Sequence, residues 1–170
     1  MSESQLAPAK YDTAITADPD VPAIRIERVF DATPEQLFRA HTEPELVAQW
    51  LGPIDLEMEV VTWDCRTGGE YRYIHRRNGE AGPEEYGFHG SFHEVGPTRL
   101  VQTFTFEGFP EGVALETMTF EDLGDGRTKL AGFSLVGSFI ERDQMLASGM
   151  ETGVVQGYQR LDNLIAEGAV

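Results

Sequence analysis

The feature that most restricts the fold of this chain is a run of short alternating segments between residues 56 and 136. In the stretch "GGEYRYIHRR" tyrosines and a histidine alternate with arginines, and "EYGFHGSFHEV" alternates aromatic with polar side chains in the same way. A period of two is typical of β-strands that bury one face. Pairs such as Asn78-Gly79 lie between the segments and favour hairpin turns. The sequence therefore predicts an antiparallel meander with one covered and one solvated face.

Two short helices are predicted ahead of this meander. Thr33 with Gln36, and again Thr42 with Glu45, have the three-residue spacing of a capping box at a helix N-terminus. The second helix carries Trp50 at its end and stops at a Gly-Pro pair. A tryptophan at the end of so short a helix is either a hydrophobic anchor or part of a pocket wall, and we expect the anchor.

The N-terminal segment has a different composition. Residues 1–22 are polar, contain prolines and show no apolar period, so we expect them to form a mobile tail. The first predicted strand covers residues 24–30, with alternating faces. The rest of the chain is long enough to bury one core, and we expect a single domain over residues 23–168.

A long helix is predicted from Ser138 to Gly168, opened by a third capping box and closed by the glycine. Its apolar stripe contains Gly149, Gly153 and Gly157, each of which costs about 1 kcal/mol of helix stability relative to alanine. Two interpretations stay open. The glycines let a strand approach the helix closely, or they leave space between the helix and the sheet.

The chain is strongly acidic, with 29 Asp and Glu against 13 Lys and Arg and a net charge of −16. Such a surface repels phosphate backbones and anionic lipid headgroups, so neither nucleic acid nor a membrane is an expected partner. A single cysteine excludes an internal disulfide, and the N-terminus does not resemble a signal peptide. We therefore expect a cytoplasmic protein that does not insert into a membrane.

Strand alternation places a set of mostly aromatic side chains on the covered face. Its members are Tyr71, Tyr73, His75, Phe88, Phe92, Phe104, Met118 and Phe120. Glu116 shares the parity of Met118 and Phe120, and a carboxylate on a covered face needs a partner, a water molecule or a ligand. The alternatives are that Glu116 reaches solvent near the strand end, or that a bulge turns it outward.

The sequence contains no complete catalytic, metal or cofactor motif. His89 and His93 lie about 13 Å apart along a predicted strand, too far to share one ion. Cys65 has no evident base beside it, and no phosphate-binding glycine loop is present. We predict no catalytic residue, no metal and no cofactor.

Four stretches carry a resemblance to a known family: "RVFDATPEQLFRAHTEPELVAQWLGP", "CRTGGEYRYIHR", "GFHGSFHEVGPTRLVQTFTF" and "GYQRLDNLIA". Together they resemble the C-terminal-domain type of the activator-of-Hsp90-ATPase homologues, within the START-like superfamily that also contains polyketide cyclases and the birch pollen allergen. The resemblance covers about residues 24–166. Gly90 and the Gly157-Tyr158 pair match the family's strand glycine and its helical glycine-aromatic pair.

This resemblance implies an α+β helix-grip fold, in which a seven-stranded antiparallel sheet wraps around a long C-terminal helix and encloses a cavity. Trp50 then lies where the second short helix closes one end of that cavity. Chaperone activators proper carry a further N-terminal domain that binds the chaperone, and we expect only a short tail in its place here. The family label therefore indicates ancestry more than activity.

Three functions follow from these observations. The leading hypothesis is the binding of a hydrophobic or aromatic small molecule between the helix and the sheet. The second is a cavity enzyme of the cyclase, dehydratase or hydrolase type, with His75, Glu116 and a tyrosine as acid and base. The third is a stress-related co-chaperone or interaction module; a homodimer also stays open. The predicted ligand-binding residues are Trp50, Tyr71, Tyr73, His75, Phe88, Phe92, Phe104, Glu116, Met118, Met150, Gly153 and Tyr158.

Overall fold

A computed structural model describes residues 8–170 of the chain, and the first seven residues of the predicted tail lie outside the described residues. The elements in chain order are β1 (Ala14–Ala17), β2 (Ala23–Phe30), α1 (Pro34–Thr42), α2 (Pro44–Trp50), β3 (Glu57–Trp63), β4 (Glu70–Gly79), β5 (Gly82–Gly96), β6 (Arg99–Phe106), β7 (Ala114–Gly124), β8 (Arg127–Leu135), α3 (Phe139–Ala147) and α4 (Met150–Ala166).

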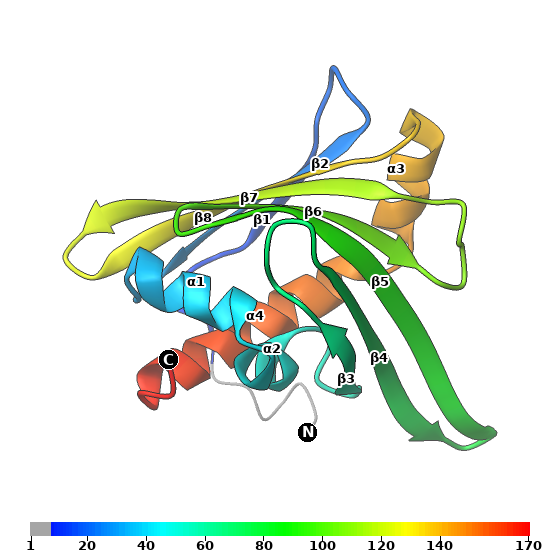
Figure 1. Cartoon of the computed structure of the whole chain (residues 1–170), viewed down its shortest axis with the longest axis horizontal. Coiled ribbons are helices and arrows are strands. Elements are labelled where there is room, and N and C mark those ends of the chain that lie inside the picture. The colour runs from blue at the N-terminus through cyan, green and yellow to red at the C-terminus, as the bar shows by residue number, and fades with distance from the viewer. Residues whose placement is uncertain (1–7) are drawn as a thin grey trace.

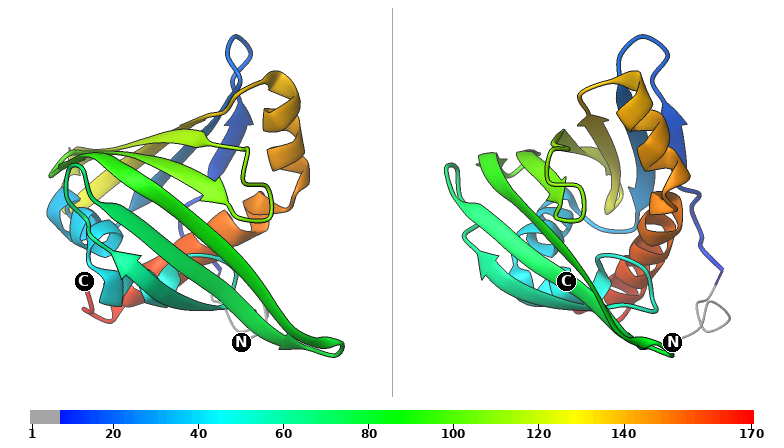
Figure 2. Two further views of the ribbon diagram at one scale, coloured as in Figure 1. Left: turned by 45° about the vertical axis from the view of Figure 1, so that its right-hand side comes forward. Right: turned by 90° about the vertical axis from the view of Figure 1, so that its right-hand side faces the viewer.

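The strands form one antiparallel sheet in the order β1-β2-β8-β7-β6-β5-β4-β3. From β3 to β8 each strand pairs with its successor, which confirms the predicted meander. The sheet is strongly curved, and α4 crosses its concave side together with α1 and α2 (Figures 1 and 2). This is the α+β helix-grip arrangement that was expected.

The sheet has eight strands in the described part of the chain, not the expected seven. The additional strand, β1, lies inside the segment that the sequence predicted to be a tail, and it pairs antiparallel with β2. The turn between them is stabilised by Asp18, whose carboxylate accepts hydrogen bonds from the backbone N–H groups of Asp20 and Val21. Arg25 also donates to Asp18, at 2.8 Å, and so fixes the turn to β2.

The predicted long C-terminal helix is two helices. The chain leaves the α3 helix at Ser148, and Gly149 adopts φ +87° as the residue before α4. This left-handed conformation interrupts the helix and is favourable only for glycine or a few polar residues. Only α4 therefore crosses the concave face, while α3 packs at one end of the molecule (Figure 1).

Gly153 and Gly157 allow close packing, but not against a strand. A Cβ atom at Gly157 would lie 2.9 Å from the Trp50 carbonyl oxygen, and one at Gly153 would lie 3.4 Å from Cδ of Pro53. Both glycines thus face the segment that follows α2. Gln156 lies between them in sequence and accepts a hydrogen bond from the Ile54 N–H at 3.0 Å, which fixes the same segment.

The helix N-termini only partly follow the capping predictions. The capping box of Thr33 and Gln36 is complete, as predicted. At the third predicted box, Ser138 accepts from the Glu141 N–H. The prediction for Thr42 is wrong, because Thr42 is the last residue of α1 and its hydroxyl donates to the Phe38 carbonyl oxygen. Helix α2 begins with a proline, whose fixed φ suits the first turn without a side-chain cap.

Trp50 is a core anchor, as expected. It is 3% exposed and belongs to the larger hydrophobic cluster, which joins α1, α2 and α4 to the sheet. Its indole N–H donates to the Ala40 carbonyl oxygen at 2.9 Å, and its ring packs against His41 and Tyr158. The tryptophan thereby holds the two short helices together and against α4.

Candidate functional site

The inner face of the sheet carries a row of polar side chains across three strands. Gln102 of β6 is paired in register with Glu116 of β7, and Glu116 is paired with Ser134 of β8. Directly opposed residues on one face have Cβ atoms about 5 Å apart, so their side chains interact. Glu116 Oε1 accepts from the Gln102 amide at 3.2 Å, and Oε2 accepts from the Ser134 hydroxyl at 3.4 Å.

This arrangement excludes the bulge as an explanation for Glu116, and the residual exposure of Glu116, the third residue of β7, agrees with the expectation that it reaches solvent near the strand end. The register of β6, β7 and β8 is regular around it, so no bulge turns the side chain outward. The residue keeps some exposure, yet burial raises the pKa of its carboxyl above the ordinary value of 4.5. Glu116 is therefore largely covered by protein but still reached by solvent.

Three tyrosines lie close enough to the Glu116 carboxylate to respond to its charge. The pKa values of Tyr71, Tyr73 and Tyr158 are raised well above their ordinary range, first by burial and then by the negative charge of Glu116. The Tyr71 hydroxyl donates to the Thr103 carbonyl oxygen at 2.6 Å. Residues from β4 and α4 thus face the same carboxylate, and their hydroxyls stay protonated at neutral pH.

An aromatic series runs along the inner face beside this polar row. Phe88 lies at its centre, with ring centroids 5.2 Å from Tyr73, 5.4 Å from Phe104 and 5.3 Å from Phe106. Tyr71 and Phe92 extend the series toward β3. The structure therefore brings together most of the predicted aromatic residues on one curved surface.

Several inward-facing residues near Glu116 remain partly exposed although α4 lies over this face. They are Ile26, Phe88, Gln102, Phe104, Met118, Gly132 and Val154. A Cβ atom built at Gly132 would meet only Ile26 within 4 Å, and at no less than 3.6 Å. A solid core would exclude solvent from such positions. We refer to the space bounded by these residues and Glu116 as the inner hollow.

His75 belongs to a different environment. Its ring packs against Gly52, where a Cβ atom would lie 2.5 Å from Cε1, and it makes a tilted contact with Tyr73 and an edge contact with Phe88. Burial lowers the pKa of His75 to about 4, so the imidazole is neutral at pH 7. Among residues 8–170 no hydrogen bond or ion pair joins His75 to Glu116. The acid-base pair of the enzyme hypothesis is therefore not assembled in this structure.

The remaining predicted residues are divided between core and helix. Trp50 and Tyr158 belong to the larger hydrophobic cluster, and Met118 of β7 packs against the same cluster. Met150 lies in the first turn of α4 and is partly exposed. Gly153 faces Pro53 instead of the sheet.

Sequence reasoning missed Gln102 and Ser134. Alternation alone could have placed both on the inner face, because Gln102 has the parity of Leu100 and Phe104, and Ser134 that of Leu130. Which inward residues become neighbours depends on strand register, and the sequence does not give the register.

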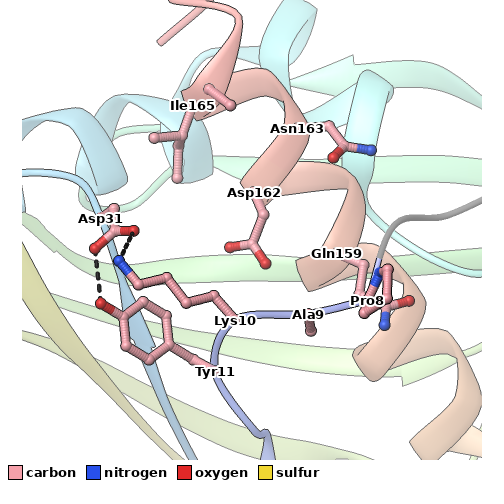
Figure 3. Close-up of a pocket in the computed structure, with 10 residues that line it drawn as sticks. Pro8, Ala9, Lys10, Tyr11, Asp31, Gln159, Asp162, Asn163 and Ile165 are labelled. Atoms are coloured by element: carbon pink, nitrogen blue, oxygen red, sulfur yellow. Dashed lines mark hydrogen bonds and ion pairs between the residues drawn. The ribbon is translucent and has the colours of Figure 1, made fainter.

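A pocket also lies beside α4, outside the inner face of the sheet described above (Figure 3). It is a pocket of about 370 Å³ between the N-terminal segment and α4, and it contains none of the predicted ligand-binding residues. Its polar groups largely bind one another, since Lys10 and Tyr11 both donate to Asp31. Within the described residues, no cluster of His, Cys, Asp and Glu has a geometry that suits a metal ion.

A curved antiparallel sheet that grips one helix, with an inner face accessible to solvent, defines a helix-grip protein of the START-like class. A family model for "Activator of Hsp90 ATPase homolog 1-like protein" matches residues 31–166, and the chain belongs to this family. Proteins of this family and class usually bind ligands or act with chaperones. No protein of curated function matches the chain.

Solved structures are similar over nearly the whole chain. A Rhodobacter sphaeroides protein is 28% identical with a TM-score of 0.79, covering 91% of this chain and 98% of that one. Protein CV1439 from Chromobacterium violaceum is 27% identical with a TM-score of 0.70, covering 84% and 96%. Protein Ms6760 from Mycobacterium smegmatis, 24% identical with a TM-score of 0.78 over 90% and 96%, has the same fold.

Proposed function

We propose that the protein binds a hydrophobic or aromatic small molecule in the inner hollow, between α4 and the concave face of the sheet. The observation that carries this proposal is the residual exposure of the inward-facing side chains near Glu116. Ligand sites of this kind are concave, mainly apolar and provided with a few converging polar groups. The aromatic series supplies the apolar wall, and the row of Gln102, Glu116 and Ser134 supplies the polar groups.

The experiment is a titration with N-phenylnaphthylamine, an uncharged dye whose fluorescence rises in an apolar site. We expect saturable binding of one dye molecule per chain. Gly132→Leu adds an isobutyl group to the inner face beside Ile26 and should abolish most of this binding, because a Cβ atom at residue 132 meets only Ile26 within 4 Å. Ala131→Leu is the matched control, since residue 131 lies on the outer face of the same strand. Absence of saturable binding, or equal loss in both variants, would contradict the proposal.

A second candidate function, a protein-interaction module, is favoured by exposed apolar side chains at one end of the molecule. Phe109 and Val113 of the β6–β7 loop are 48% and 51% exposed, and Phe139 and Ile140 of α3 are 46% and 71% exposed. All views place this loop beside α3 (Figures 1 and 2). Exposed apolar side chains that gather in one region can mark an interaction site. Stimulation of the Hsp90 ATPase by the wild-type protein, lost in Ile140→Asp, would support this candidate.

A further inference from the structure

Glu116 is a largely buried carboxylate, and no cationic side chain of residues 8–170 pairs with it. Its hydrogen-bond partners are the neutral side chains of Gln102 and Ser134, at 3.2 and 3.4 Å. No lysine, arginine or histidine of residues 8–170 forms an ion pair with it, although eleven of the thirteen Lys and Arg side chains form ion pairs elsewhere. Buried carboxylates are ordinarily paired with a cation or protonated. This one has unused acceptor capacity, since an ionised carboxylate accepts about four hydrogen bonds.

The surroundings of the carboxylate suit a molecule that combines a cationic group with an apolar part. The aromatic series centred on Phe88 lies on the same face, and Tyr71 and Tyr73 are close enough to feel the charge of Glu116. The faces of aromatic rings attract ammonium groups, most strongly where water is excluded. The overall charge of −16 adds a long-range potential that favours cations over anions.

We propose that the inner hollow selects amines, namely aromatic or aliphatic molecules whose protonated amino group is bound by the Glu116 carboxylate. This inference rests on the proposed function and names the chemical class of its ligand. Gln102 and Ser134 each donate to a different carboxylate oxygen, so they orient the group and leave lone pairs for the ligand's N–H donors. The aromatic wall then holds the apolar part of the molecule.

The same geometry gives the binding a pH dependence. Only the ionised carboxylate pairs with an ammonium group, and burial raises the pKa of Glu116 above 4.5. The other titratable groups that face it are Tyr71, Tyr73 and Tyr158, which stay protonated and uncharged throughout the neutral range. Amine affinity should therefore fall as the pH is lowered through the raised pKa of Glu116, while the affinity of a neutral analogue should not change.

The test is the displacement of bound N-phenylnaphthylamine by naphthylethylamine and by naphthylethanol, two molecules that differ only in the amino and hydroxyl groups. For the wild type we expect the amine to bind at least about tenfold more tightly, as charge-assisted hydrogen bonds do. Glu116→Gln should remove this preference and its pH dependence but keep dye binding. Glu121→Gln, an exposed residue on the opposite face of β7, should keep the preference.

The outcomes separate the two proposals. If the wild type does not bind the dye, the proposed function is wrong and this inference is wrong with it. If the dye binds but amine and alcohol displace it equally, only the selection of amines is wrong. An equal loss of preference in Glu116→Gln and Glu121→Gln would attribute it to the general acidity of the surface and would also overturn the inference.

Discussion

Breaking the ion pair between Arg28 and Asp162 on one side should strongly destabilise the contact between α4 and the sheet. The Arg28 side chain is 0% exposed, and its guanidinium donates to both carboxylate oxygens of Asp162, at 2.7 and 2.5 Å. It also donates to the Val29 carbonyl oxygen, at 2.9 Å. Asp162→Ala removes two of these three acceptors and leaves a charge in the interior. The pair therefore matters most when it is broken on one side.

The expected loss can be worked from this geometry. Removing one partner of a buried pair costs ~3–5 kcal/mol, and the 27% exposure of the Asp162 side chain places the value near the lower limit. With a urea m-value of about 2 kcal/mol/M, a loss of about 3 kcal/mol lowers the unfolding midpoint by about 1.5 M. The transition can be followed by the fluorescence of Trp50 and Trp63.

A double variant is the control for this prediction. Replacing both partners, as Arg28→Met with Asp162→Leu, removes the charge and its partner together and should restore stability to within about 1 kcal/mol of the wild type. The reasoning would be refuted if Asp162→Ala shifted the midpoint by less than a quarter of the expected amount. A double variant as unstable as Asp162→Ala would refute it equally.

Three further predictions concern the helix contact and the buried titratable groups. Gly157→Ala should lower the thermal stability, because its Cβ would lie 2.9 Å from a backbone oxygen. Gly153→Ala should be tolerated, because its Cβ would lie 3.4 Å from a side-chain atom. Thermal denaturation of the two variants compares their unfolding temperatures. Glu116→Gln should stabilise the ligand-free protein increasingly as the pH rises, because a raised pKa makes ionisation costly in the folded state; urea midpoints at two pH values test this. His41, whose pKa burial lowers to about 4, stabilises the fold above pH 6.5 and should lose this contribution as the pH falls toward 4, so His41→Gln should show a flatter acid-unfolding profile.

Much of the fold could be predicted from the sequence because alternation and turn residues are local properties. The meander and the two short helices follow from them directly. The break at Gly149 could not, because a glycine costs a helix only about 1 kcal/mol and the apolar stripe continues through it. Its left-handed conformation depends on how α3 and α4 pack. Strand β1 was missed because four residues gain stability only from pairing with β2.

The candidate site was predicted in part, because the alternation that places side chains on one face of a strand is also a local property of the sequence. Parity placed Glu116 and the aromatic residues on the inner face correctly, and the structure brings Tyr73, Phe88 and Phe104 together. Parity did not reveal that Gln102 and Ser134 flank Glu116, since this depends on the register of three strands. It also gave no information on the distance between His75 and Glu116, two residues that share a face but lie in separate environments.

None of the described helices is long and apolar enough to cross a membrane. The second candidate function concerns the exposed apolar side chains of the β6–β7 loop and α3. Binding in the hollow and interaction at this end concern different surfaces. Gly132→Leu and Ile140→Asp test them independently.

The central claim is that a small molecule binds beneath α4, and a crystal structure of the protein soaked with naphthylethylamine tests it most directly. We predict electron density for the naphthyl group against Phe88 and Phe104, with the amino nitrogen within hydrogen-bond distance of Glu116. An interior closed by core side chains, or a ligand bound only on the outer surface, would contradict the account.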